Sequence, residues 1–203
     1  MPTHHHHDTK GVDFGVRAVR YDSGWTGAFT RYCHRTFLLS VDIANGATVL
    51  DVGCGTGALL RQIVDRFHAV GIGVEPSEQM AAVARSKHPE LSILPGVATE
   101  LPVPDASIDA VVACLAYHHF EDRPAFLQQV TRVLKDTGSL YLVELNLPKP
   151  LNALVNAVVA HHGYVERVFY ATQLCTELKH AGWVPTLLHG GLIQVVKATV
   201  QPH

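Results

Sequence analysis

The sequence predicts an α/β protein with a seven-stranded, mainly parallel sheet, helices on both faces and an antiparallel hairpin at the C-terminal end. Three observations support this fold class. Short apolar runs that suit buried strands alternate with segments of helical periodicity. A glycine-rich loop at 53–57 joins the first strand to a helix, and Gly190-Gly191 separates the last two apolar runs.

The individual elements follow from these apolar runs and from the residues that flank them. Ser77 can cap a helix that His88-Pro89 ends, and Asp122 can cap the next helix, with Pro124 in its first turn. Strands are expected at 48–52, 69–75, 91–94, 108–114, 139–145, 183–188 and 193–200, helices at 58–67, 77–87, 122–134, 151–160 and 171–180, and turns at 45–46 and 135–138.

The chain is expected to form one domain, because 203 residues with 47% hydrophobic side chains suffice for a single core. Its N-terminal part is expected to contain helical pieces that are interrupted around Ser23-Gly24 and Gly27. The expected parts are a disordered tail at 1–13 that contains the run His4–His7, and a domain at 14–203 in which 14–44 is a helical leader or cap and 147–170 is a lid.

Charge and composition argue against several classes of function. Lysine and arginine total 16 against 18 acidic residues and are scattered, so no nucleic-acid-binding surface is indicated. No apolar run approaches the ~18 residues of a membrane span, and no basic-then-apolar signal is seen, so a cytoplasmic protein is expected. The 4 cysteines form no C-x-x-C pair, and neither a disulfide framework nor a metal site is indicated.

The glycine loop predicts a binding site for a nucleotide-like ligand. Without Cβ atoms at Gly53, Gly55 and Gly57, a ligand can lie against the backbone, and the N–H groups that begin the following helix offer donors. Glu75 ends the second strand about 20 residues later, where a carboxylate can accept hydrogen bonds from both ribose hydroxyls. A Walker-type loop would need Gly-Lys-Ser/Thr, and a dinucleotide loop would need the third glycine one residue later. The alternative is that these glycines serve only tight packing.

Several elements together resemble the class I S-adenosylmethionine-dependent methyltransferases. They are the strand and loop at 49–57, the acid Glu75, the block Glu-Leu-Pro-Val-Pro-Asp-Ala-Ser-Ile-Asp at 100–109 and the block Arg-Val-Leu-Lys-Asp-Thr-Gly at 132–138. The resemblance covers residues 45–200 and implies a Rossmann-like fold with S-adenosylmethionine as cofactor. It looks closest to the methyltransferase type 11 group that includes the ubiquinone and menaquinone C-methyltransferases, on features such as Tyr21-Asp22, Glu144-Leu145 and Gly190-Gly191.

The resemblance also implies where the cofactor lies. It places the methionine end on the backbone of the glycine loop, with Asp51 near the ammonium group, where a carboxylate favours a cation. Glu75 would hold the ribose hydroxyls, and Met80 would pack near the adenine. Cys54 lies within the loop and is given no chemistry of its own. The implied cofactor-binding residues are Asp51, Gly53, Cys54, Gly55, Gly57, Glu75, Pro76, Met80, Val97, Ala98, Thr99 and Cys114.

One position departs from the family pattern. The family usually has Gly-Asp-Ala before the Leu-Pro element, with the aspartate accepting a hydrogen bond from the adenine amine, whereas this chain has Gly96-Val97-Ala98-Thr99. The side chain of Val97 cannot accept a hydrogen bond. Either a backbone carbonyl or Thr99 takes the amine, or the affinity falls by about 1 kcal/mol for the lost bond.

Two histidines and one tyrosine are candidates for the chemistry of methyl transfer. Transfer from a sulfonium is an in-line displacement that depends largely on positioning, and a base is required only if the acceptor must lose a proton. His118 and His119 follow the fourth strand, beside the cofactor in this fold, and either could serve as the base or orient the substrate. Tyr21 could close over the sulfonium. The alternative for all three is an ordinary packing role.

The expected function is S-adenosylmethionine-dependent methyl transfer to a small, apolar or aromatic acceptor, by C- or O-methylation. The apolar segment 151–160 motivates this acceptor class. A homodimer is left open. One alternative is a cofactor- or partner-binding protein on the same fold with little catalysis, and another is a thiol or metalloid methyltransferase. The glycine spacing disfavours a nicotinamide oxidoreductase.

Overall fold

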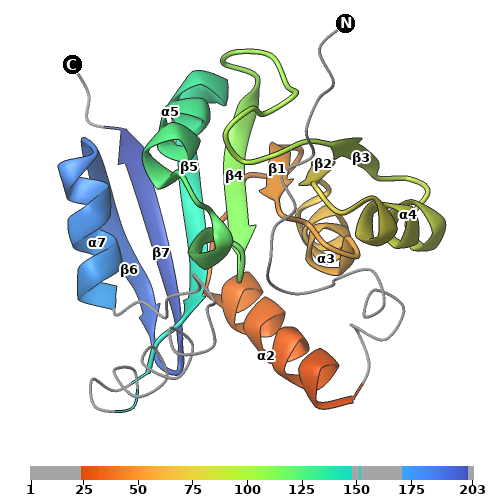
Figure 1. Ribbon diagram of the computed structural model, residues 1–203, viewed down its shortest axis with the longest axis horizontal. Helices are drawn as coiled ribbons and strands as arrows, with labels where there is room; N and C mark the ends of the chain where they lie inside the picture. The colour runs from red at the N-terminus through yellow and green to blue at the C-terminus, as the bar shows by residue number, and fades with distance from the viewer. Residues whose placement is uncertain (1–23, 148–150, 152–170, 201–203) are drawn as a thin grey trace, which may run out of the picture.

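A computed structural model of the chain describes residues 24–147, 151 and 171–200. The described strands form a seven-stranded sheet in the order β3-β2-β1-β4-β5-β7-β6 (Figure 1). The predicted sheet and its C-terminal antiparallel hairpin are confirmed. The strands are β1 (Thr48–Val52), β2 (Val70–Glu75), β3 (Ser92–Pro95), β4 (Ile108–Cys114), β5 (Leu134–Leu145), β6 (Trp183–Gly190) and β7 (Ile193–Val200).

The five strands from β1 to β5 run parallel, and β7 pairs antiparallel with both β5 and β6. The chain passes outward from β1 through β2 to β3 and then returns to place β4 on the other side of β1. This reversal is a topological switch point, and in open α/β sheets ligands bind at the carboxyl ends of the strands beside it. The glycine loop follows β1 and therefore lies at that position.

Helices cover both faces of the sheet. The alternation of side chains along each strand produces two apolar clusters, because successive residues point to opposite faces. One cluster includes Leu50 and the buried residues of α5 and α7, and the other includes Val49 and the buried residues of α2, α3 and α4. The described helices are α2 (Gly24–Ser40), α3 (Ala58–Phe67), α4 (Glu78–Lys87), α5 (Arg123–Val133) and α7 (Ala171–His180), with a 3-10 turn η2 at Tyr117–His119.

The predicted helix caps are confirmed by hydrogen bonds. The Ser77 hydroxyl accepts from the Met80 N–H at 3.3 Å, and the Asp122 carboxylate accepts from the Ala125 N–H at 2.9 Å. Among the described residues, no helix has the length and apolar character that crossing a bilayer requires.

Two local predictions were wrong. The expected break at Gly27 is absent from α2, which runs without interruption from Gly24 to Ser40, because the burial of residues such as Cys33 and Phe37 outweighs the low helix propensity of Gly27. The expected turn at 135–138 belongs to β5, where the Lys135 ammonium bonds both carboxylate oxygens of Asp109 at 2.9 Å and keeps this segment beside β4. The tail at 1–13, residues 14–23, the helix at 152–160 and almost all of the lid lie outside the described residues.

Candidate active site

The glycine loop leaves β1 in a conformation that favours glycine. Gly53, Gly55 and Gly57 have φ values of 76°, 54° and 75°, in the left-handed region. The N–H groups of Gly53 and Cys54 donate to the Val74 carbonyl at 2.8 and 3.2 Å, and the Gly57 N–H donates to the Cys54 carbonyl at 2.9 Å. These N–H groups are used in hydrogen bonds that hold the loop in shape. The loop's main contribution to ligand binding is therefore to let a ligand approach the backbone closely.

The space beside two of these glycines shows which of them packs against the protein and which leaves room for a ligand. A Cβ atom on Gly53 would lie 2.9 Å from the Cβ of Ala116, so the loop after β1 touches the loop after β4 there. A Cβ on Gly55 would meet nothing within 4 Å. Gly55 therefore faces open space at the carboxyl edge of the sheet, as a cofactor cradle requires.

Glu75 is tied to the glycine loop. It ends β2 and is buried, and its Oε2 accepts from the Gly55 N–H at 2.8 Å while its Oε1 accepts from the Ser77 N–H at 2.9 Å. Burial raises the pKa of this carboxyl, and the two N–H donors oppose the shift. Each carboxylate oxygen can accept more than one hydrogen bond, so ribose hydroxyls could still bind it.

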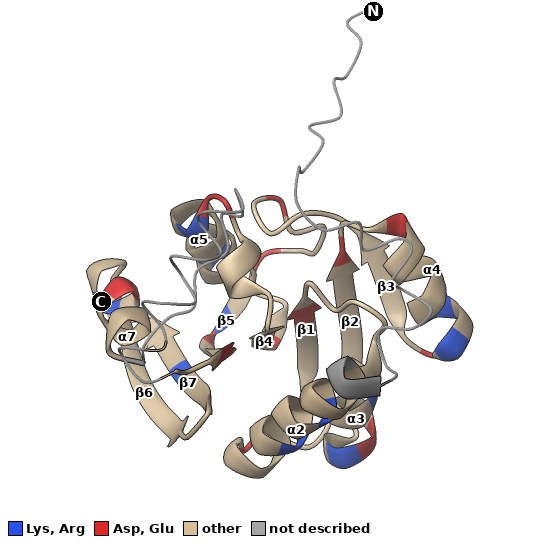
Figure 2. Ribbon diagram, turned by 60° about the horizontal axis from the view of Figure 1, so that its bottom comes forward, with Lys and Arg blue, Asp and Glu red and all other residues tan. Residues whose placement is uncertain are grey.

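Asp51 lies next to the end of β1 and is 2% exposed. Figure 2 shows acidic residues at the carboxyl ends of β1 and β2. Burial, and next the negative charge of Glu75, raise the pKa of Asp51 to about 7. Two buried acids that repel one another favour a cationic ligand group, because a cation lowers the cost of ionising both. The ammonium and sulfonium of S-adenosylmethionine fit this requirement.

The residues that the resemblance places near the adenine differ in how far they are exposed. Met80 is buried on α4, and Ala98 is half-buried against the core, whereas Pro76 and Thr99 are exposed. Val97 is 48% exposed and accepts from the Glu100 N–H through its carbonyl at 3.1 Å. An apolar side chain therefore stands at the surface where the family usually has an acid.

The surroundings of the cysteines in this region indicate a packing role. Cys54 is buried, and a Cβ on Gly73 would lie 2.6 Å from its Sγ, so the thiol fills the space that Gly73 leaves. Burial raises the pKa of Cys54, Cys114 and Cys33, the last to about 12. All 4 cysteines of the chain are free thiols. Because buried, protonated thiols are poor ligands, these cysteines do not favour the metalloid methyltransferase alternative.

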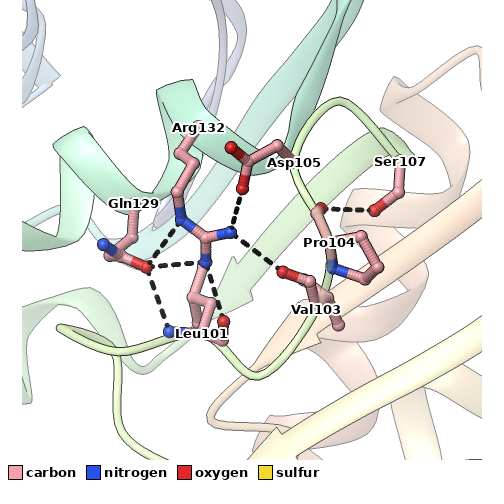
Figure 3. Close-up of polar contacts among 7 residues, drawn as sticks. All are labelled: Leu101, Val103, Pro104, Asp105, Ser107, Gln129 and Arg132. Atoms are coloured by element: carbon pink, nitrogen blue, oxygen red, sulfur yellow. Dashed lines mark hydrogen bonds and ion pairs between the residues drawn. The ribbon is translucent and has the colours of Figure 1, made fainter.

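A single arginine joins the blocks at 100–109 and 132–138 (Figure 3). Arg132 donates from Nη2 to the Leu101 carbonyl at 2.8 Å and from Nη1 to the Val103 carbonyl at 3.0 Å. Its Nη1 also pairs with Asp105 at 2.6 Å. Gln129 accepts from Arg132 Nη2 at 2.8 Å and from the Leu101 N–H at 3.2 Å. These contacts of Arg132 fix the Leu-Pro segment on α5.

The loop after β4 holds the two candidate histidines. Their rings lie 4.0 Å apart between centroids, and His119 is exposed. His118 pairs through Nδ1 with Oε2 of Glu144 at 2.7 Å. Sequence reasoning did not single out Glu144 as a site residue, although an acid in the apolar run of β5 was the available signal. Tyr21, the third candidate, lies outside the described residues.

Known proteins share this sequence pattern and this fold. Residues 50–142 match the methyltransferase domain family. The chain is 35% identical over 101 residues to demethylmenaquinone methyltransferase of Chlorobaculum tepidum, covering 50% of this chain and 42% of that protein. It is 38% identical over 98 residues to a Mycolicibacterium smegmatis protein described as a probable S-adenosylmethionine-dependent methyltransferase, covering 48% and 37%. The matched stretches thus span about two-fifths of these relatives.

Solved structures agree on the fold. A SAM-dependent methyltransferase from Aquifex aeolicus superimposes with a TM-score of 0.74 and 18% identity, over 92% of this chain and 98% of that one. This likeness supports the α/β fold that the sequence predicts. Residues 50–142 are thus similar to the methyltransferase domain, and the relatives that match in this region include a probable S-adenosylmethionine-dependent methyltransferase.

Proposed function

We propose that this domain binds S-adenosylmethionine at the carboxyl edge of β1 and β2 and transfers its methyl group to a small apolar or aromatic acceptor, on carbon or oxygen. One observation carries the proposal. Gly55 opens onto free space, two buried acids, Asp51 and Glu75, lie at the carboxyl ends of the adjoining strands β1 and β2, and the Gly55 N–H donates to Glu75.

Each residue would have a distinct part in holding the cofactor. Asp51 would attract the ammonium group, Glu75 would accept from the ribose, and Gly55 would allow the methionine part to lie against the backbone. Met80 would pack near the adenine. The bound cofactor supplies an electrophilic methyl group on a good leaving group, so orientation of the acceptor provides much of the rate.

Titration calorimetry tests the cofactor assignment directly. Saturable binding of both S-adenosylmethionine and S-adenosylhomocysteine at micromolar concentration is expected. Gly55→Val should abolish binding because its side chain fills the cradle, and Glu75→Ala should weaken it by about 1–3 kcal/mol. The proposal fails if neither compound binds saturably to the wild-type protein.

Mass spectrometry tests the transfer. Incubation with S-adenosylmethionine and a panel of phenols, quinols, amines and thiols should give a gain of one methyl group on a phenol or quinol. The demethylmenaquinone methyltransferase relative motivates the inclusion of a reduced naphthoquinone. Tight cofactor binding with no methylated product from any acceptor would favour the alternative of a cofactor- or partner-binding protein.

We also propose that segment 147–170 forms the lid over the acceptor and that the protein acts in the cytoplasm. The free thiols support a reducing compartment. A homodimer is a further proposal, which size-exclusion chromatography with light scattering tests.

A further inference from the structure

The end of β5 and the loop after β4 hold a pair of side chains that the cofactor site does not use. Nδ1 of His118 lies 2.7 Å from Oε2 of Glu144. The side chain of Glu144 is 3% exposed, whereas that of His118 is 20% exposed. The carboxylate is thus inside the protein, and part of the imidazole reaches its surface.

The backbone fixes the position of this pair. Cys114 at the end of β4 is opposite Val143 of β5, and the Leu115 N–H donates to the Val143 carbonyl at 2.8 Å. Leu115 has φ 52°, a left-handed conformation that is unusual for leucine and turns the chain sharply into η2. Ala116 then packs close to Gly53 of the glycine loop. His118 therefore follows directly after the point where the two loops meet.

The second oxygen of Glu144 makes the pair unusual. Oε1 is buried and accepts no hydrogen bond from the described residues. A buried carboxylate needs compensation for its lost hydration, and among the described residues His118 lies within hydrogen-bond distance and can become a cation. The arrangement therefore favours a proton on Nδ1 and stabilises the imidazolium form of the ring.

We propose that Glu144 is a positioning residue that holds the Nδ1–H of His118, so that Nε2 of His118 takes the proton of the methyl acceptor, and that this acceptor is a phenol or an enol. The inference rests on the proposed function and narrows its acceptor class. Acceptors without a proton to lose, such as thioethers and tertiary amines, would gain nothing from this arrangement.

Proton transfer to His118 and methyl transfer to the acceptor together conserve atoms and charge. The O–H bond of the acceptor breaks, its proton goes to Nε2, and the electron pair that remains on the acceptor forms the bond to the methyl carbon, through oxygen or the conjugated carbon. Bound S-adenosylmethionine would supply the methyl group, and its sulfur would retain the electron pair of the broken carbon–sulfur bond. The positive charge passes to His118, beside the negative charge of Glu144.

The geometry also distinguishes the two histidines. His119 is exposed, and its ring lies against that of His118. Protonation of both rings would place like charges together, and the bond to Glu144 gives the preference to His118.

Other titratable groups lie within the field of Glu144. Its charge contributes to the raised pKa of Cys33 on α2, Cys114 on β4 and Tyr117 on η2, in each case after the larger effect of burial. Tyr117 also bonds Glu177 of α7 at 3.1 Å and lies beneath the guanidinium of Arg123 on α5. Gln194 of β7, directly opposite Glu144 in the sheet, is polar but does not titrate.

Nuclear magnetic resonance of the labelled protein, with and without S-adenosylhomocysteine, tests the pair without any acceptor. In Glu144→Gln the titration midpoint of the His118 ring should move to lower pH by about one unit or more, because an opposite charge has been removed. The matched control is Glu177→Gln, which makes the same chemical change at a carboxylate bonded to Tyr117. It should leave the His118 midpoint where it is.

Glu144→Asp keeps the negative charge and provides a second test of the pairing if Glu144→Gln does not fold. It should give a midpoint between those of the wild-type and Gln proteins. An unchanged His118 midpoint in the folded variants would overturn the pairing. Calorimetry on the same samples measures S-adenosylhomocysteine binding and so tests the proposed function separately. If the compound does not bind, the proposed function is wrong. If it binds but the His118 midpoint is unchanged in the variants, only the pairing of His118 with Glu144 is wrong.

Turnover tests the role in proton transfer. With catechol and 1,4-dihydroxynaphthalene as probes, Glu144→Gln should lower kcat by about tenfold or more with little change in KM, and His118→Gln by about a hundredfold. The acidic limb of the kcat/KM profile should move to lower pH in Glu144→Gln. The acceptor assignment is wrong if neither probe is methylated, or if dimethyl sulfide is methylated equally well by the wild-type and His118→Gln proteins.

Discussion

At the scale of a single residue, we expect Asp51 to couple cofactor binding to pH. Its pKa of about 7 means that ionisation of this carboxyl in the folded protein occurs near neutral pH. The shift is upward for an acid, so the contribution of Asp51 to stability is fully present below its ordinary pKa and is lost as pH rises through about 7. A cationic ligand reverses this loss by favouring the ionised form.

We therefore expect the affinity for S-adenosylmethionine to rise about tenfold between one pH unit below and one unit above the pKa of Asp51. Calorimetry in buffers of different ionisation enthalpy should also show proton release on binding near pH 7. Asp51→Asn should bind more weakly and lose this pH dependence. The same pH dependence in Asp51→Asn would assign the effect to another group.

Two glycines of the same loop should respond differently to alanine. Gly53→Ala combines a left-handed backbone with a contact of 2.9 Å to Ala116, and should lower the free energy of unfolding by about 2–4 kcal/mol. Gly55→Ala has only the backbone strain, about 1–2 kcal/mol, because its Cβ meets nothing.

The two variants should also differ in their affinity for S-adenosylhomocysteine. Gly55→Ala should lose at least about tenfold in S-adenosylhomocysteine affinity, corresponding to about 1.4 kcal/mol, because the added methyl group enters the cradle. Denaturant unfolding and calorimetry on both variants check this. Wild-type affinity in Gly55→Ala would place the ligand elsewhere.

At the scale of elements, the Leu-Pro segment depends on α5 through Arg132. Arg132→Ala removes the ion pair with Asp105 and the bonds to the Leu101 and Val103 carbonyls, and should cost about 2 kcal/mol in the free energy of unfolding. Arg132→Lys keeps the charge but loses the forked geometry, so it should recover only part of this stability.

Arg61 provides the control for this prediction, because its charge is paired with Asp65 and Glu90 on an exposed face of α3, as that of Arg132 is paired with Asp105. Arg61→Ala should change the denaturation midpoint little, since solvent screens such pairs. Equal losses in Arg61→Ala and Arg132→Ala would show that Arg132 contributes only through its charge.

At the scale of the whole molecule, α2 links the N-terminal part of the chain to the central sheet. Phe37 is fully buried and meets Tyr141 of β5 edge to face, with centroids 5.9 Å apart. The Tyr141 hydroxyl donates to the Asp42 carbonyl at 3.4 Å. These contacts seat α2 beside the carboxyl ends of the strands (Figure 1), so the helix should support both the fold and the ligand site.

Phe37→Ala should lower the free energy of unfolding by about 3–5 kcal/mol, because it leaves a cavity in the core. Leu39→Ala on the same helix is the matched control, since Leu39 is 67% exposed and its truncation should stay within about 0.5 kcal/mol. Chemical denaturation of both variants measures the difference. A small loss in Phe37→Ala would mean that α2 is not part of the cooperative core.

Local patterns were sufficient to predict most of this fold. The apolar runs located all the described strands, and Ser77 and Asp122 located two helix starts, because caps and strand burial act over a few residues. They failed at Gly27 and at 135–138, where packing of α2 and the bond between Lys135 and Asp109 outweigh local preference.

The sequence by itself determined the class of fold and the glycine loop, because these depend on short motifs in a fixed order, and its resemblance to known methyltransferases implied the cofactor. Only the tertiary structure decided the surroundings of the titrating groups. Burial beside Glu75 raises the pKa of Asp51, and strand pairing brings Glu144 to His118 across 26 residues of chain. Distances between side chains far apart in sequence arise only when the sheet assembles, and the proposed chemistry depends on those distances.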